Sequence, residues 1–240
     1  SAGLPEVEVA KQPTIRVIST GNELIPAGDP IADHQVRLSN GPAVVAMLEA
    51  HGYKHASQDH LVDDPDLLEA RIAEHLEAAD MLILSGGVSM GKADFVPQVL
   101  KDLGVEVIFH RISQRPGKPM WFGKGKEGQS VFALPGNPVS TLVCCRQYVV
   151  PALRDIGGEP PPQKVFASLT QAVIFKPRLT NFLPVRAVSN ATAQLLAVPT
   201  PTNTSGDFAA LSGTDGYVTL NRSQTEFDSG SVVPFVRWAG

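Results

Sequence analysis

The sequence is poor in cysteine, in excess basic charge and in long apolar runs. Its only two cysteines, Cys144 and Cys145, are adjacent and lie in an apolar stretch. They therefore indicate reduced core residues and a cytoplasmic protein, not a disulfide framework or a metal-binding pair. The formal net charge of −4 argues against a general nucleic-acid binder, which needs a basic face. No apolar run could cross a membrane, and residues 1–13 lack the apolar core of a signal peptide.

Two kinds of catalytic centre are also missing from the pattern. His51 and His55 are four residues apart, but Gly52 lies between them at the end of a predicted helix, so they are not expected to share a helical face. The other histidines are scattered. We therefore find no zinc site and no Ser-His-Asp arrangement that the spacing supports.

What the chain does contain is the composition of a globular protein, with 43% hydrophobic and 18% charged residues. Its 240 residues predict two domains. After an N-terminal linker (residues 1–13), strand-like and helix-like segments alternate over residues 14–156, which predicts an α/β domain with a three-layer parallel sheet. The expected strands are "TIRVIST", a weaker one at 53–58, "MLILS", "VEVIFH", "MWFG" and "SVFAL". The expected helices are one capped by Ser39 or Asn40, one starting at Asp64-Pro65, the segment "DFVPQVLKDLG", and one from Asn137 to about Ile156 that Pro151 kinks.

The pattern changes after a proline-rich linker, residues 157–163 ("GGEPPPQ"). Residues 164–240 contain short alternating strands separated by turn residues, such as "FLPVRAV", "GYVTLN" and "SVVPFVRW". This predicts a small all-β C-terminal domain, either a barrel or a sandwich.

Four loops that follow predicted strands carry polar, charged or glycine residues. In open α/β sheets the ligand binds beyond the carboxyl ends of the strands, so these loops are candidates for one site. They are "STGNEL" with Glu23, "SGGVSMGKADF" with Gly86, Gly87, Ser89 and Asp94, "RISQRPGKP" with Arg111, Arg115 and Lys118, and "LPGNPVS" with Pro135, Gly136, Asn137 and Ser140.

Each loop also has a purely structural interpretation. Asn137, Asp64 and Asp94 are in positions where they would cap helices. A helix N-terminus behind a glycine is equally suited to bind a phosphate. The basic stretch, which runs on to Lys124 and Lys126, resembles a solvated charged loop, but prolines and a glycine around Lys118 indicate a positioned cation for an oxyanion.

The motifs "STGNEL", "SGGVSMGKADF", "RPGKPMWFG" and "LPGNPVS", in this order, resemble the molybdopterin molybdenumtransferase family, which includes MoeA-like enzymes and the gephyrin E-domain. The resemblance covers nearly the whole chain and implies that adenylylated molybdopterin and molybdate are converted into molybdenum cofactor and AMP, with Mg²⁺. It implies a metal and molybdate neighbourhood at Glu23, Asp94 and one of Asp63 or Asp64, with Glu23 and Asp94 on the metal. By the same resemblance, the expected catalytic residues are Glu23, Asp63, Asp94 and Lys118. Molybdopterin would be bound by Gly86, Gly87, Ser89, Arg111, Arg115, Pro135, Gly136, Asn137, Ser140 and, from the β domain, Ser205.

The sequence also departs from the family pattern. Asn22 and Leu38 stand where members often have aspartate, and Arg111 and Arg115 where lysines are common. By resemblance, two N-terminal domains precede this region, the full-length protein is a homodimer, and an adenylyltransferase is a possible partner. We therefore expect the chain to bind pterin but to turn over slowly by itself. A molybdopterin adenylyltransferase and a non-enzymatic, gephyrin-like scaffold remain the alternative functions.

Overall fold

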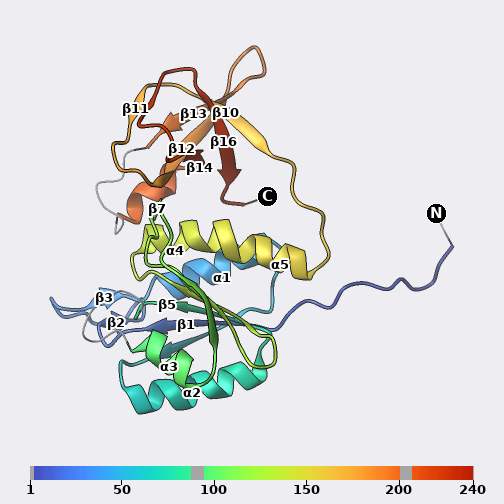
Figure 1. The fold of residues 1–240 in the computed structure, drawn as a ribbon, viewed down its shortest axis with the longest axis vertical. Coiled ribbons are helices and arrows are strands. Elements are labelled where there is room, and N and C mark those ends of the chain that lie inside the picture. The colour runs from blue at the N-terminus through green and yellow to red at the C-terminus, as the bar shows by residue number, and fades with distance from the viewer. Residues whose placement is uncertain (1–2, 88–94, 201–206, 240) are drawn as a thin grey trace.

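The first half of the chain forms a six-stranded sheet in the order β4-β1-β5-β9-β8-β6. The computed structural model describes residues 3–87, 95–200 and 207–239 (Figure 1). The strands are β1 (Ile15–Thr20), β4 (Ser57–Leu61), β5 (Met81–Ser85), β6 (Glu106–His110), β8 (Trp121–Lys124) and β9 (Ser130–Leu134). Every residue of β5 and of β9 is buried, as expected for central strands covered on both faces.

Helices cover both faces of this sheet, which gives the predicted three layers. On one face pack α1 (Asn40–Ala50) and the continuous segment α4 (Pro138–Cys144), η1 (Cys145–Val149) and α5 (Val150–Ile156). On the other face pack α2 (Pro65–Ala78) and α3 (Val96–Asp102). The π-helical turn η1 ends two residues before Pro151, which has no N–H to donate within a helix. The irregularity predicted at Pro151 is thus accommodated by a wider turn.

The sheet is parallel from β4 to β9 and antiparallel beyond it. β1 pairs in parallel with β4 and β5, and β5 with β9, whereas β8 runs antiparallel to both β9 and β6. No helix lies between β6, β8 and β9, and a parallel connection needs a crossover of a dozen or more residues. Since β8 is reversed, β6 again points the same way as β9. The loop after β6 therefore lies on the same side of the sheet as the loops after β1, β5 and β9, at the carboxyl ends of these strands. We refer to this side as one edge of the sheet and to the side at the amino ends of these strands as the opposite edge.

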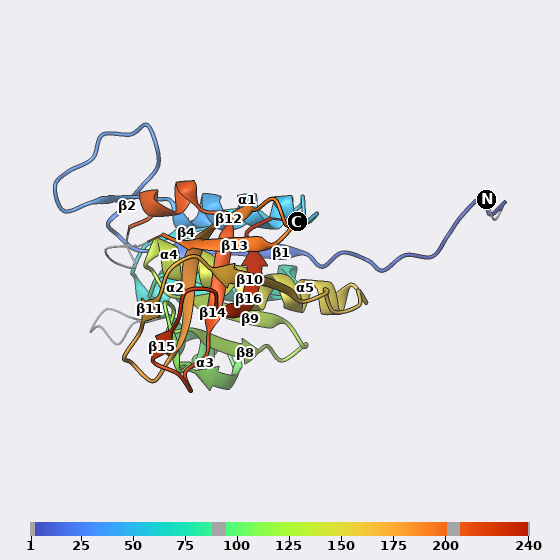
Figure 2. The ribbon, with the colours of Figure 1, turned by 90° about the horizontal axis from the view of Figure 1, so that it is seen from above.

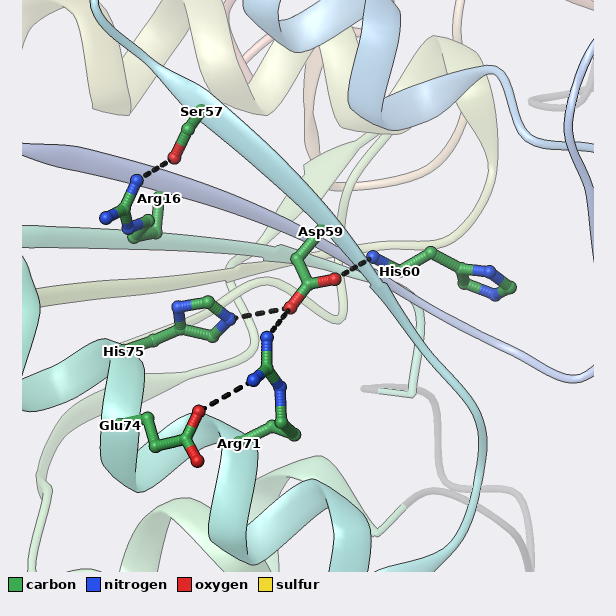
Figure 3. A network of polar contacts seen from close by, with 7 residues as sticks. All are labelled: Arg16, Ser57, Asp59, His60, Arg71, Glu74 and His75. Atoms are coloured by element: carbon green, nitrogen blue, oxygen red, sulfur yellow. Dashed lines mark hydrogen bonds and ion pairs between the residues drawn. The ribbon is translucent and has the colours of Figure 1, made fainter.

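An ion-pair network fastens α2 to the edge strand β4 (Figure 3). The Asp59 carboxylate accepts hydrogen bonds from Arg71 Nη2 at 2.8 Å and from His75 Nε2 at 2.9 Å. Burial acts to raise the pKa of Asp59, but these two hydrogen bonds and one from the His60 N–H outweigh it, so the pKa is lowered. The network holds the strand whose carboxyl end leads into Asp63 and Asp64.

The second domain is a closed five-stranded barrel, which decides between the two predicted forms. Its strands follow the order β13-β10-β16-β14-β12, and pairing of β12 with β13 closes the ring. They are β10 (Val165–Leu169), β12 (Thr180–Ser189), β13 (Leu195–Pro199), β14 (Gly216–Leu220) and β16 (Val232–Arg237). The smaller elements are β2 (Leu24–Ile25) with β3 (Val36–Arg37), β11 (Val173–Ile174) with β15 (Glu226–Phe227), and the 3₁₀ helix η2 (Ala209–Gly213).

The barrel packs on the α1 and α4–α5 layer of the α/β domain, above it in Figure 1. An apolar cluster of α4 and barrel side chains fills the contact: Val139, Val143, Phe182, Leu211 and Tyr217. A short strand of the α/β domain, β7 (Gln114–Arg115), also adds to the barrel sheet beside β12. In Figure 2 the N-terminal segment and the loop between β2 and β3 project away from both domains. None of the helices in the described ranges is both long and apolar enough to cross a membrane.

Candidate functional site

The glycine loop after β5 bends tightly against the end of β1. Gly86 has a φ of +99° and Gly87 a φ of +64°, values that L side chains rarely adopt. A Cβ on Gly86 would lie 2.5 Å from the Thr20 carbonyl oxygen, and one on Gly87 would lie 2.7 Å from Val96 Cγ2. Close backbone approach between β1, β5 and α3 therefore requires both glycines.

Asn40, the first residue of α1, ties the glycine loop to the loop after β9. Its Nδ2 donates to Ser85 Oγ at 2.9 Å and to the Gly136 carbonyl oxygen at 2.7 Å. A Cβ on Gly136 would lie 3.6 Å from Gly86 Cα. The structure thus brings together the two loops that the sequence predicted at a phosphate site.

The loop "LPGNPVS" enters α4 with Asn137 at the N-cap position and Pro138 in the first turn. The Asn137 side chain makes no capping hydrogen bond to the helix. Thr141 Oγ1 instead donates to the carbonyl oxygens of Pro135, at 2.6 Å, and Asn137, at 3.1 Å. Ser140 is only 4% exposed, so α4 directs it toward the interior.

The acidic candidates divide between two roles. Asp64 caps α2, because its carboxylate accepts the Leu67 N–H at 3.0 Å. Asp63 faces the loop after β1, where Asn22 N donates to it at 3.3 Å and Asn22 Oδ1 accepts the Asp63 N–H at 3.0 Å. The Glu23 carboxylate folds back over Gly21, 2.7 Å from where a Cβ would be. Glu23 and Asp63 therefore flank the same turn, and Asp64 stabilises a helix.

Three predicted site residues, Ser89, Asp94 and Ser205, lie outside the described residues. Helix α3, which follows Asp94, has Phe95 at its N-cap position. Within the described ranges no group of three or more His, Cys, Asp or Glu side chains is arranged to hold a metal ion. The described part of the edge contributes two carboxylates, from Glu23 and Asp63, and carboxylate oxygens are the donors that Mg²⁺ prefers.

The basic loop after β6 is a rigid turn with its charged side chains exposed. Arg111, in a left-handed conformation with a φ of 70°, donates its N–H to the Met120 carbonyl oxygen at 2.8 Å. The Ile112 N–H donates to the Lys118 carbonyl oxygen at 2.9 Å. The side chains of Arg111, Arg115 and Lys118 are all exposed, as an oxyanion-binding loop requires.

The inner side of this loop packs against the helical segment α4–η1, which has Asn137 as its N-cap. Gln114 is 1% exposed; its Nε2 donates to the Pro116 carbonyl oxygen at 3.1 Å, and its Oε1 accepts from the Tyr148 hydroxyl. Burial, and next the neighbouring Cys144, raises the pKa of Tyr148 to about 12, so the hydroxyl remains a donor. A Cβ on Gly117 would lie 2.3 Å from Cys144 Sγ. The basic loop therefore sits directly against α4.

Lys124 and Lys126 do not belong to this group. The reversed strand β8 carries them to the opposite edge of the sheet, where Lys124 Nζ donates to Ser130 Oγ at 2.9 Å. That edge also holds a cavity of about 1060 Å³, between residues 11–14 and 124–130. None of the predicted site residues lines it, so the candidate functional site is the edge where the glycine, acidic and basic loops meet.

Sequence reasoning missed the residues that hold this site together. The sequence pattern predicts Asn40 only as a possible helix cap and gives no role to Thr20 or Gln114. Residues that they contact lie far along the chain (Ser85 and Gly136 for Asn40, Gly86 for Thr20, Tyr148 for Gln114), so no local pattern marks them. The available signals are a polar residue inside two of the loop motifs, in "STG" and "SQRPG", and one at the start of a predicted helix, in "LSNG".

Comparison with known proteins defines the class of domain that carries this edge. Residues 16–155 match a family described as a probable molybdopterin binding domain. Residues 167–238, which include the barrel, match the MoeA C-terminal region (domain IV). Together the two matches show that the chain belongs to the molybdopterin molybdenumtransferase (MoeA) family.

Individual relatives agree over nearly the whole chain. It is 37% identical to a molybdopterin molybdenumtransferase of Synechocystis, covering 99% of this chain and 59% of that protein. It is 31% identical to the enzyme of the same name from Staphylococcus aureus (strain N315), covering 98% and 56%. The solved molybdopterin biosynthesis moea protein of Pyrococcus horikosii superposes with a TM-score of 0.78 at 31% identity, covering 95% and 55%. The chain thus spans little more than half the length of these proteins.

Proposed function

We propose that this chain carries the substrate-binding and catalytic edge of a molybdopterin molybdenumtransferase. The reaction inserts molybdate into adenylylated molybdopterin and releases AMP. One observation carries the proposal: Asn40 holds the glycine loop and the "LPGNPVS" loop together at the same edge to which β1, β4 and β6 deliver acidic and basic loops. The relatives' names support molybdenum transfer to molybdopterin, and the resemblance of the four motifs supplies the adenylylated substrate and the release of AMP.

In this proposal the phosphate of molybdopterin binds to the glycine loop and the start of α4. Backbone N–H groups at a helix N-terminus favour an anion, and a glycine lets it approach. The predicted ligands are Gly86, Gly87, Ser89, Pro135, Gly136, Asn137 and Ser140, with Ser205 from the β domain. Arg111, Arg115 and Lys118 hold the oxyanions, because guanidinium forks and an ammonium group provide charge-assisted hydrogen bonds to them.

The acidic side chains complete the proposed site. Glu23 and Asp94 would hold Mg²⁺, with Asp63 beside them. When bound there, the ion would polarise the phosphoanhydride that is cleaved. The residues of the chain orient the two substrates: the basic loop places molybdate, and the two glycine-containing loops hold the pterin phosphate. The proposal includes a homodimeric full-length protein in the cytoplasm.

The test is AMP release from adenylylated molybdopterin with molybdate and Mg²⁺. We expect Asp94→Ala to abolish this release while adenylylated molybdopterin still binds. Lys118→Ala should weaken oxyanion binding in a salt-sensitive way, because charge attraction between exposed groups is screened at high ionic strength. Lys126→Ala is the matched control, because it removes a lysine that lies at the opposite edge of the sheet.

Two outcomes would refute this assignment. If Asp94→Ala and Lys118→Ala release AMP as fast as the unchanged protein, the loops are structural. If the chain instead consumes ATP and molybdopterin when molybdate is omitted, it is an adenylyltransferase. Because the chain spans only part of its relatives, a slow rate does not by itself count against the proposal, and rates are compared between variants of the same chain.

A further inference from the structure

Two buried side-chain oxygen atoms beside the glycine loop have no hydrogen-bond partner. Within the described residues, the buried side-chain oxygens that lack a hydrogen-bond partner are Thr20 Oγ1 and Asn40 Oδ1. Both flank the same turn, Ser85-Gly86-Gly87. Asn40 donates to Ser85, and Thr20 Oγ1 lies 3.0 Å from the Cβ positions of Gly86 and of Gly87.

The orientation of the Asn40 amide follows from its neighbours. The Gly136 carbonyl oxygen is an acceptor only, so the atom 2.7 Å from it must be the amide nitrogen. The same nitrogen reaches Ser85 Oγ at 2.9 Å, so both amide protons are used. The remaining atom, Oδ1, accepts hydrogen bonds and nothing else.

A buried acceptor without a partner is unfavourable, and native proteins leave few of them. Such atoms are expected where a ligand brings the missing group. An acceptor oxygen cannot form a hydrogen bond with an unprotonated phosphate or molybdate oxygen, because that oxygen is also an acceptor. It is suited to an N–H group, and a pterin carries such groups on its ring and its amine.

We infer that Asn40 both positions the two anion-binding loops through its amide nitrogen and selects a ligand N–H group through its carbonyl oxygen. The ligand class is an N–H-bearing heterocycle joined to a phosphate. This inference rests on the proposed function, which it deepens by assigning recognition of the heterocycle to a residue outside the four loop motifs.

The experiment compares two probes by calorimetric titration of the 240-residue chain: molybdopterin, which has both groups, and inorganic phosphate, which has no N–H. We expect Asn40→Leu to weaken both, because the loops lose their tie. Molybdopterin should be weakened by about tenfold more than phosphate, the effect of one lost hydrogen bond in a buried site. Asn40→Asp keeps an acceptor oxygen, loses the N–H donors and adds a negative charge. It should therefore weaken both anionic probes, and molybdopterin by no more than phosphate, because the acceptor for its N–H group remains.

Gln129→Leu is the matched control, because the Gln129 amide donates to the Leu76 carbonyl oxygen at 2.8 Å at the opposite edge of the sheet. It should leave both affinities unchanged. Should Asn40→Leu fail to fold, as judged by thermal denaturation, Asn40→Asp still decides the question, since a loss of molybdopterin affinity greater than the loss of phosphate affinity there would overturn the inference. An unchanged ratio in a folded Asn40→Leu would also overturn it. An unchanged chain that binds no molybdopterin would overturn both the inference and the proposed function.

Discussion

Replacing Gly86 by alanine should destabilise the protein through backbone strain and through a steric clash. The same substitution at Gly28 should show the strain alone. Gly86 and Gly28 have the same φ of +99°. A Cβ on Gly86 would lie 2.5 Å from the Thr20 carbonyl oxygen, whereas one on Gly28 would have nothing within 4 Å. The two substitutions therefore share the backbone strain and differ in the clash.

The size of each part follows from general magnitudes. A non-glycine residue in the left-handed region costs roughly 1–2 kcal/mol. Forcing extra atoms into a packed site costs roughly 1–3 kcal/mol more, and here the obstacle is backbone, which cannot rotate away. Gly28→Ala should thus lower the free energy of unfolding by about 1–2 kcal/mol, and Gly86→Ala by about 2–5 kcal/mol.

Urea denaturation measures both values. Tryptophan fluorescence is a suitable probe, because Trp121 is 1% exposed and lies in the same core cluster as Val96. The comparison is valid where the slope of the transition is the same for each variant. Equal destabilisation by Gly86→Ala and Gly28→Ala would refute the reasoning, because it would mean that the loop can move away from Thr20 without cost.

Three further predictions follow from other parts of the structure. Asp59→Asn should reduce stability at neutral pH. The contribution of the carboxylate is fully present above its ordinary pKa of 3.8, so the difference should diminish below that pH and disappear as the pH falls through the lowered pKa of Asp59; stability curves against pH for both proteins test this. Burial raises the pKa of Cys145 to about 12 and that of Cys144 further, so neither thiol should react with iodoacetamide at pH 8 until urea unfolds the chain. Asp64→Ala should cost about 1 kcal/mol of stability as a lost helix cap and leave phosphate affinity unchanged in a titration; a fall in affinity would instead place Asp64 in the site.

The layers of the α/β domain could be predicted because their signals are local. Buried, largely apolar strands such as β5 and the Asp64-Pro65 start of α2 depend on residues close together in the sequence. The expectation that the loops with polar, charged and glycine residues lie at one edge also depends only on the direction of the strands that precede them. It is correct for the loop after β6 because two reversals, into β8 and out of it, restore that direction.

The arrangement of the basic residues shows where local reasoning fails. Lys118 and Lys124 are separated by six positions, yet they lie at opposite edges of the sheet because β8 runs between them. Which way a strand runs depends on its hydrogen-bonded partners and not on its own residues. The same holds for the closure of the barrel, since the pairing of β12 with β13 exists only once the whole ring has formed.

The two domains are also less independent than a proline-rich linker implies. Strand β7 holds Arg115 of the basic loop, and its pairing with β12 places Arg115 opposite Asn181 of the barrel. On the other side, Tyr217 of the barrel donates to Gln147 Oε1 at 2.6 Å, and Arg146 Nε donates to the Arg237 carbonyl oxygen at 2.7 Å. The barrel thus holds both the loop that carries the cations and the helix that follows the "LPGNPVS" loop. Its contribution to the candidate site is therefore geometric, because it fixes how far the positive groups stand from the start of α4.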